Sequence, residues 1–327
     1  MFRKGTLMKS YELVAETIRG NNPGRTPVYG WIAWNLDWEH SEWGDYKKFE
    51  DEYEFDMAHI FGGPYPFDYH KIVGMKKEGI TITPQMLLDM PLQPVDRMED
   101  YESIRKELEY YRGERERFCY MQTPGIFECL SDPLAIENHL LYMALYPDEM
   151  VELYKRQAKW NAQFAENVCE LGMDMIHVSD DWGSQNTLLF SPTMFREMIM
   201  PGHKVIGDAV RKHGKFLSLH SDGNIIPALD GVIELGYNLV HPWQEAAGMS
   251  YDLWLEKYSD KFAIMGGVCV QTALGFGNYE KLESDIRRVF SLLKGKRWVC
   301  CTTHFVQEHC TFEELKFAYD LIAELRK

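Results

Sequence analysis

The chain has 327 residues, of which 45% are hydrophobic and 26% are charged. These proportions are ordinary for a soluble globular protein, and the length is sufficient to bury a core without disulfide or metal staples. Fifty acidic and thirty-five basic residues give a formal net charge of −15, which repels nucleic-acid phosphates and anionic lipid head groups. We therefore expect neither nucleic acid nor a membrane as a partner, although a local basic pocket for a small anion stays open.

Neither export nor membrane insertion is indicated by the sequence. Residues 1–20 lack the apolar core of about seven residues that a signal peptide needs, and no later stretch approaches the ~18 apolar residues of a membrane span. The seven cysteines contain no CxxC pair and no disulfide-like spacing. These features predict a cytoplasmic protein with reduced thiols.

Short apolar or β-branched runs alternate along the chain with amphipathic helical stretches, which predicts parallel strands joined by helices. The expected strands cover residues 27–33, 117–123, 175–179, 215–220, 237–242, 261–267 and 297–303. An eighth strand is expected near residues 53–61 or 79–85, although the first of these segments could equally begin a helix. Because no linker or internal repeat interrupts the chain, we expect one domain over residues 1–327, an α/β fold of the (β/α)8 TIM-barrel type.

Two helix starts are marked by capping residues. Ser191 followed by Pro192 predicts an N-cap with a first-turn proline. Thr311 with Glu314 three residues later predicts a capping box at the start of the last helix.

Polar side chains that directly follow the expected strands are the first candidates for a site, because the active site of a parallel barrel is built on the loops that leave the strands. These residues are Asp180, Asp181, His220, Asp222, His241 and His304. Three of them, His220, Asp222 and His304, would form a set of two imidazoles and one carboxylate. Zinc or iron could bind to such a set and keep a position open for substrate or water.

Two other roles are open for the same three residues. His304 or Asp222 could move a proton without any metal. Alternatively, His220 could bind backbone, Asp222 could form an Asx-turn, and His304 could simply pack. The spacing alone does not separate these roles.

Further candidates for substrate binding surround these residues, namely Trp31, Trp34, Glu128, Asp180, Asp181, Trp182 and His241. The loop at residues 180–182 could orient a substrate, or it could be the N-cap turn of a helix. The tryptophans near the first expected strand could line a pocket for an apolar or planar ligand, or they could belong to the core. Glu128 could contact the substrate or be solvated.

Several segments, in order and nearly end to end, resemble the uroporphyrinogen decarboxylase superfamily. They are FDMAHIFGG, TPGIFECL, GMDMIHVSDDWGS, LHSDGNIIPALDGVIELGYNLVHPWQ, MGGVCVQTAL and TTHFVQEHCTFEEL. The resemblance implies a distorted (β/α)8 barrel. It does not fix the reaction, because the superfamily holds both porphyrin decarboxylases and methylcobamide:coenzyme M methyltransferases.

The decarboxylase branch agrees with this chain only in part. Its members clamp substrate carboxylates with an arginine-rich loop after the first strand, whereas the corresponding stretch here, YGWIAWNLDWEHSEWGDY, has no arginine. Tryptophans and acids at that place would repel an octa-acid substrate. Asp56 nevertheless resembles the pyrrole-binding aspartate of the decarboxylases, and Asp222 and His304 also resemble residues of that branch.

In the methyltransferase branch, zinc is bound by a His-x-Cys pair and a later cysteine. His220 matches the histidine, Asp222 replaces the first cysteine, and His304 falls where the last cysteine would be. The resemblance therefore implies a metal site with harder ligands. Carboxylate and imidazole give zinc less negative charge than two thiolates, so a bound thiolate would be less nucleophilic.

From these observations we expect a metal-assisted, corrinoid-linked methyltransferase that acts on a small methylated compound. The expected cofactors are zinc or another divalent metal, with a corrinoid as substrate or as the cofactor of a partner protein. A homodimer is expected because barrels of this superfamily often pair. The alternatives are a cofactor-free decarboxylase of uroporphyrinogen or a related polyacid, and a non-catalytic barrel that only binds its ligand.

Overall fold

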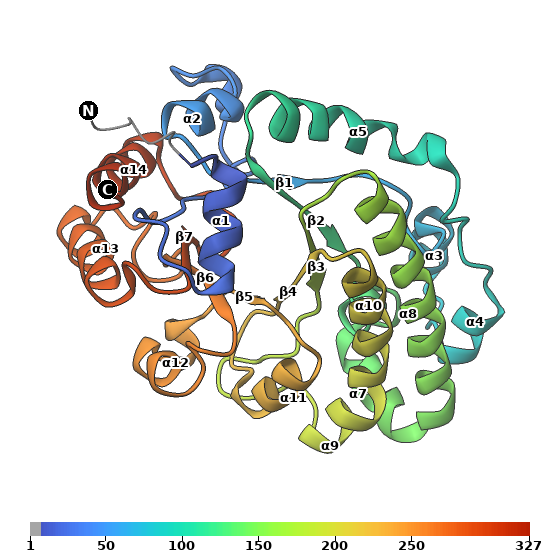
Figure 1. The fold of residues 1–327 in the computed structure, drawn as a ribbon. Helices are drawn as coiled ribbons and strands as arrows, with labels where there is room; N and C mark the ends of the chain where they lie inside the picture. The colour runs from blue at the N-terminus through green and yellow to red at the C-terminus, as the bar shows by residue number, and fades with distance from the viewer. Residues whose placement is uncertain (1–7) are drawn as a thin grey trace. The chain divides into compact units, whose positions relative to one another are not determined.

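The structure is a computed structural model that describes residues 8–327 (Figure 1). The chain falls into two compact units, each assembled from separate segments. The first unit contains the residues up to Ala58, Tyr111–Cys119 and Asn238–Lys327, and the second contains His59–Tyr110 and Tyr120–Tyr237. Among residues 8–327 there is no helix with the length and hydrophobicity that a membrane crossing requires. The expected single domain stays a prediction.

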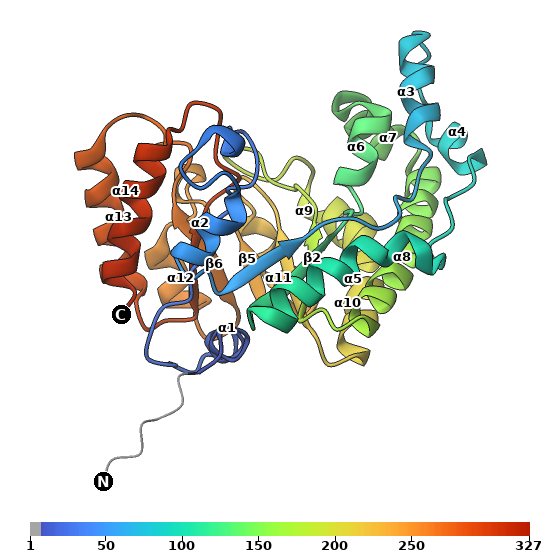
Figure 2. The same cartoon turned by 90° about the horizontal axis from the view of Figure 1, so that it is seen from above.

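Three parallel strands form the centre of the second unit, and the first of them begins with two residues of the first unit. They are β2 (Phe118–Thr123), β3 (Met175–Ser179) and β4 (Phe216–His220), and His177 of β3 lies opposite Gln122 on one side and Ser218 on the other. Two long helices, α8 (Pro147–Glu170) and α10 (Met200–Lys212), pack side by side in this unit (Figures 1 and 2). The other α-helices of this unit are α3 (Tyr69–Lys77), α4 (Pro84–Asp89), α5 (Glu102–Leu108), α6 (Glu128–Leu134), α7 (Ile136–Leu145), α9 (Pro192–Met194) and α11 (Leu229–Glu234).

The first unit also has parallel strands, β5 (Leu239–His241), β6 (Ala263–Val268) and β7 (Trp298–Thr302). Its helices α13 (Tyr279–Leu293) and α14 (Phe312–Leu325) lie side by side in both views. Its remaining α-helices are α1 (Ser10–Arg19), α2 (Tyr46–Glu52) and α12 (Tyr251–Lys257). Within β1 (Met57–Ile60) the chain passes from the first unit to the second.

Six of the expected strands are confirmed as β2 to β7. A further strand is expected near residues 53–61 or 79–85, and the first of these places is correct, because it contains β1. The other place, residues 79–85, runs into α4, which Thr83 caps. The fold class is therefore α/β. Residues 8–327 contain seven strands, so an eight-stranded barrel is not confirmed.

The strand expected at residues 27–33 is wrong, because only Val28 forms a β-bridge, with Cys300. The Tyr29 N–H does donate to the Cys300 carbonyl, but side chains take the donors on either side of it. The Val28 N–H donates to the Asp56 carboxylate (3.0 Å), and the Trp31 N–H donates to the Thr302 hydroxyl (3.0 Å). Pro27 has no N–H to offer.

Both expected N-cap residues are confirmed, but the capping box expected at Thr311 is only half formed, because the Glu314 carboxylate binds another partner. Ser191 accepts a hydrogen bond from the Met194 N–H, and Thr311 accepts one from the Glu314 N–H. The Glu314 carboxylate accepts from the Gly277 N–H, so this side chain joins α14 to the loop before α13. All seven cysteines are free thiols.

Candidate functional site

Four carboxyl groups gather where β2, β3 and β4 end in the second unit. Glu128 opens α6 after β2, Asp180 and Asp181 follow β3, and Asp222 follows β4. We call these four residues the acidic cluster. Parallel neighbouring strands bring their carboxyl ends to one edge of a sheet, which is why residues so far apart in sequence interact here.

Asp180 is fully buried and is held by four donors. Its Oδ1 accepts from the backbone N–H groups of Phe127 (2.8 Å) and Glu128 (2.7 Å), and its Oδ2 lies 2.8 Å from Trp182 Nε1 and 2.7 Å from His203 Nε2. These contacts join the start of α6, the loop after β3 and α10, so Asp180 holds the three segments together. The geometry therefore gives Asp180 and the fully buried Trp182 a positioning role, and their expected contact with substrate stays a prediction.

His203 is a residue that sequence reasoning missed. It lies buried on α10, with Nδ1 2.6 Å from the Tyr237 hydroxyl and Nε2 beside Asp180. A histidine within an amphipathic helix, far from any strand end, carries no signal in a single sequence. Its role depends on long-range contacts that only the fold shows.

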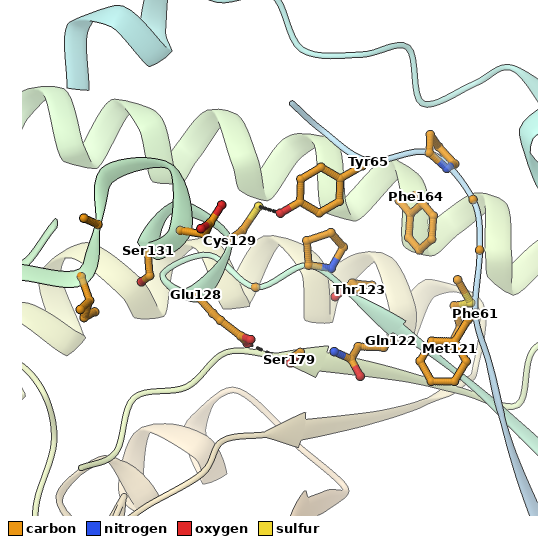
Figure 3. Close-up of a pocket in the computed structure, with 18 of the residues that line it drawn as sticks. Phe61, Tyr65, Met121, Gln122, Thr123, Glu128, Cys129, Ser131, Phe164 and Ser179 are labelled. Carbon is orange, nitrogen blue, oxygen red and sulfur yellow. Dashed lines mark hydrogen bonds between the residues drawn. The ribbon is translucent and has the colours of Figure 1, made fainter. Parts of the chain in front are cut away.

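The Glu128 side chain points toward the end of β3, where its Oε2 accepts a hydrogen bond from the Ser179 hydroxyl (2.9 Å; Figure 3). Burial, followed by the negative charges of Asp181 and Asp180, raises the pKa of Glu128 to about 8. The side chain is therefore mainly a neutral acid at pH 7. A neutral carboxyl group can donate a hydrogen bond, which a carboxylate cannot do.

His220 and Asp222 lie next to Asp181. The Asp222 backbone N–H donates to Asp181 Oδ1 (2.8 Å), and His220 Nε2 lies 3.7 Å from the same oxygen. Burial, followed by the charge of Asp181, raises the pKa of Asp222 to about 7. Two acids thus lie beside a buried imidazole, at a place where Asp181 is 38% exposed, and Asp222 is about half protonated near neutral pH.

Close backbone packing fixes this arrangement. The Asn224 N–H donates to the Ser184 carbonyl (2.8 Å), and a Cβ at Gly183 would lie 2.4 Å from the Asp222 carbonyl oxygen. Gly223 has φ of 77°, a conformation that favours glycine. The Gly183 and Gly223 positions therefore let the loops after β3 and β4 touch.

The imidazole of His220 and the carboxyl group of Asp222 are suitable ligands for a divalent cation. Imidazole and carboxylate are ligands of zinc and of harder divalent metals, and a cation would replace the proton that otherwise separates two crowded acids. His220 and Asp222 are the residues that would hold it. His304 belongs to the first unit, so the expected set of His220, Asp222 and His304 stays a prediction.

In the first unit, aromatic rings surround the remaining predicted residues. His241 is fully buried, with its ring 4.8 Å from Trp31 and Nε2 3.1 Å from the Thr302 carbonyl oxygen. The His304 ring lies 5.9 Å from the Trp31 ring. Trp34 is 40% exposed, so this indole could contact a ligand, whereas Trp31 is buried.

Asp56 is fully buried among partners from the same unit. It binds both Arg25 and Arg326, and it also accepts hydrogen bonds from the Ser10 hydroxyl (2.7 Å) and the Val28 N–H. These contacts join three separate parts of the first unit and give Asp56 a structural role. The expected role in binding a pyrrole ring stays a prediction.

Comparison with known proteins places the chain in a family. The uroporphyrinogen decarboxylase (URO-D) family matches residues 133–325. A solved structure described as a methyltransferase from Methanosarcina mazei is similar to this chain with a TM-score of 0.71 and 15% identity, over 98% of this chain and 100% of that one. This likeness concerns the fold.

A second solved structure, a B12-independent methionine synthase from Shewanella sp., has a TM-score of 0.46 and 12% identity, over 68% of this chain and 66% of that one. It is too distant to carry an argument. No curated protein matches the sequence. Because the family match covers more than half of the 327 residues, the chain belongs to the uroporphyrinogen decarboxylase family.

Proposed function

We propose that the protein is a metal-assisted methyltransferase that moves a methyl group between a small methylated compound and a corrinoid, either free or held by a partner protein. One observation carries this proposal. The buried His220 and the partly buried Asp222 lie beside Asp181, and partial burial together with the charge of Asp181 raises the pKa of Asp222 to about 7. Such a crowded set of acids and imidazole is suited to a divalent cation.

Each residue has a separate part in the proposal. His220 and Asp222 would bind the metal, and Asp181 would orient Asp222 through its backbone N–H. The bound metal would act as a Lewis acid toward the methyl acceptor or donor. His304, which follows β7, is proposed as a third ligand because its order in the sequence matches that of the family's last zinc ligand.

The negative charge near the site also bears on the substrate. The acidic cluster would repel a polyanion, whereas it tolerates a neutral compound or a cation. This favours a small methylated compound over a polycarboxylate. We therefore do not propose decarboxylation of uroporphyrinogen as the function.

Metal content tests the proposal directly. We expect the purified protein, after zinc loading and dialysis, to hold about one zinc ion per chain by elemental analysis. His220→Ala and Asp222→Asn should lose most of it, and His304→Ala tests the third ligand. His40→Ala is the matched control, because His40 is an exposed histidine with 78% of its side chain accessible.

Equal zinc in the wild type and His220→Ala would contradict the proposed site. A second assay tests the reaction, by following the appearance of methylcobalamin absorbance when cob(I)alamin is mixed with a small methylated compound. Zinc binding without any methyl transfer would favour the alternative of a binding protein.

A further inference from the structure

The second unit contains a cavity of about 870 Å³ beside Glu128 (Figure 3). This volume lies in the range of sites for small molecules, roughly 300–1,000 Å³. Phe61, Tyr65 and Phe164 contribute aromatic rings to its lining, and Thr123 and Glu128 contribute polar groups. The Tyr65 hydroxyl lies 3.5 Å from Cys129 Sγ, which anchors the tyrosine ring at the cavity.

Thr123 points to a ligand because its hydroxyl group is buried without a partner. The residue is fully buried at the carboxyl end of β2, and its Oγ1 has no hydrogen-bond partner among residues 8–327. Buried hydroxyl groups in native proteins are nearly always hydrogen-bonded to protein, water or ligand. The cavity beside Thr123 provides room for such a partner.

The charges around the cavity exclude an anionic ligand. Among the described residues that line it, the cation is Lys76, and its Nζ lies 2.8 Å from Asp132 Oδ1, so its charge is already paired. Glu137 adds a negative charge to the lining, and Asp180 and Asp181 of the acidic cluster add their charges beside Glu128. These acids would repel an anion, and no unpaired cation among the described lining residues offsets the repulsion.

The same lining is also poorly suited to an organic cation. A buried cation needs an ionised partner. Of the acids in the lining, Glu137 is exposed and Asp132 is already in an ion pair, so Glu128 is the one that lies mostly inside the protein. Burial and the neighbouring acids raise the pKa of Glu128 to about 8, so this side chain is mainly a neutral donor. The lining thus offers the Thr123 hydroxyl, a neutral acid, the Gln122 amide and aromatic faces.

We infer that this cavity binds a neutral aromatic compound with an oxygen acceptor, such as a phenol or an aryl methyl ether. The ring would lie against Phe61, Tyr65 and Phe164, where aromatic faces pack favourably. The oxygen would face Thr123 and Glu128. The inference names a substrate class for the proposed methyltransferase and rests on that function in this respect, whereas binding itself needs no turnover.

Calorimetric titration of the metal-free protein with anisole at pH 7 tests the inference. We expect saturable binding of anisole, and at least tenfold weaker binding of benzoate and of benzyltrimethylammonium. Thr123→Val keeps the shape of the side chain and removes the hydroxyl group, so it should weaken binding by roughly three- to tenfold, as expected for one hydrogen bond. Phe61→Ala, at a residue that is 42% exposed, should weaken binding without threatening the fold.

Thr26→Val is the matched control. Thr26 is also a buried threonine whose hydroxyl group has no partner among residues 8–327, but it belongs to the first unit and does not line the cavity. We expect it to bind anisole like the wild type. The inference is overturned if the wild type does not bind anisole, if either ion binds more tightly, or if Thr26→Val weakens binding as much as Thr123→Val.

The two proposals fail separately. Anisole binding without zinc binding or methyl transfer would overturn the proposed function, but the inferred ligand of the cavity would still hold. Zinc binding with methyl transfer, but without anisole binding, would overturn only the substrate class.

Discussion

At the residue scale, buried histidines make the second unit sensitive to acid. His139 is fully buried, with Nδ1 3.0 Å from the Ser131 hydroxyl and Nε2 2.6 Å from the Tyr154 hydroxyl, and it stacks on Phe127. Burial lowers the pKa of His139 to about 3. The side chain is therefore neutral in the folded protein between about pH 3 and pH 6.5, where an exposed histidine is already charged.

This buried histidine predicts a loss of stability on acidification. In the unfolded chain a histidine takes up a proton below about pH 6.5, whereas folded His139 does so only near pH 3. Falling pH therefore favours the unfolded state, by roughly 2 kcal/mol between pH 6.5 and 5 from this residue alone. Urea unfolding at both pH values should show a smaller loss for His139→Gln.

His40→Gln is the control for this measurement, because His40 is exposed and should keep the wild-type dependence on pH. His139→Gln will be less stable than the wild type at pH 7, since two hydrogen bonds are disturbed. Only the difference between the two pH values counts. Equal differences in the wild type and His139→Gln would show that His139 can be charged in the folded state.

At the element scale, the start of α6 decides where Glu128 points. Asp180 accepts the N–H groups of Phe127 and Glu128, and its negative charge at the helix start also suits the helix dipole. Gly125 allows this approach. A Cβ at Gly125 would lie 2.1 Å from the Ser179 carbonyl oxygen and 2.2 Å from Asp180 Oδ1.

Gly125→Ala should therefore force the loop before α6 away from β3. We expect a loss of roughly 1–3 kcal/mol in the free energy of unfolding, as for other overpacked sites, measured by guanidinium denaturation. Gly74→Ala is the matched control, because a Cβ at Gly74 meets nothing within 4 Å and the residue lies inside α3. That change should be neutral or stabilise the protein by up to ~1 kcal/mol. Equal destabilisation by both changes would contradict the argument.

Elements differ in how well the sequence predicts them. The run at residues 175–179 coincides with β3, because a short, fully buried apolar segment between polar turns has few alternatives. The run at residues 27–33 looks the same in sequence, yet Asp56 and Thr302 take two of its backbone donors. These partners are distant in sequence, so no local pattern could reveal them.

The site follows the same rule. Strand ends identified the segments that carry Asp180, Asp181, His220 and Asp222, because chemistry at strand ends follows from the fold class. Which side chain caps α6 and which faces the cavity could not be predicted. That choice depends on buried partners such as His203, and on the burial that changes the pKa of Glu128.

At the scale of the whole molecule, the distribution of charge limits the substrates. The net charge is −15, and the acidic cluster places four acids at the ends of three neighbouring strands. Three arginine side chains that could attract an anionic substrate are bound to acids of the protein itself. In the first unit Arg25 and Arg326 bind the buried Asp56, and Arg117 binds Glu50 and Asp51.

These charges lead to a prediction about porphyrinogens, the substrates that the family name suggests. Incubation with uroporphyrinogen should give no decarboxylated product by chromatography. The reason is charge repulsion, because each substrate carboxylate within about 4 Å of an ionised acid raises the free energy of binding by on the order of 1 kcal/mol even in water, and by more in a buried site. Any residual binding of the oxidised uroporphyrin, followed by fluorescence, should strengthen as salt screens the repulsion. Asp181→Asn, which removes one charge of the acidic cluster, should likewise strengthen it, whereas Asp260→Asn, an exposed acid of the first unit, should not. Turnover of uroporphyrinogen, or binding that weakens with salt, would mean that cations converge on the substrate and that the acidic cluster does not face it.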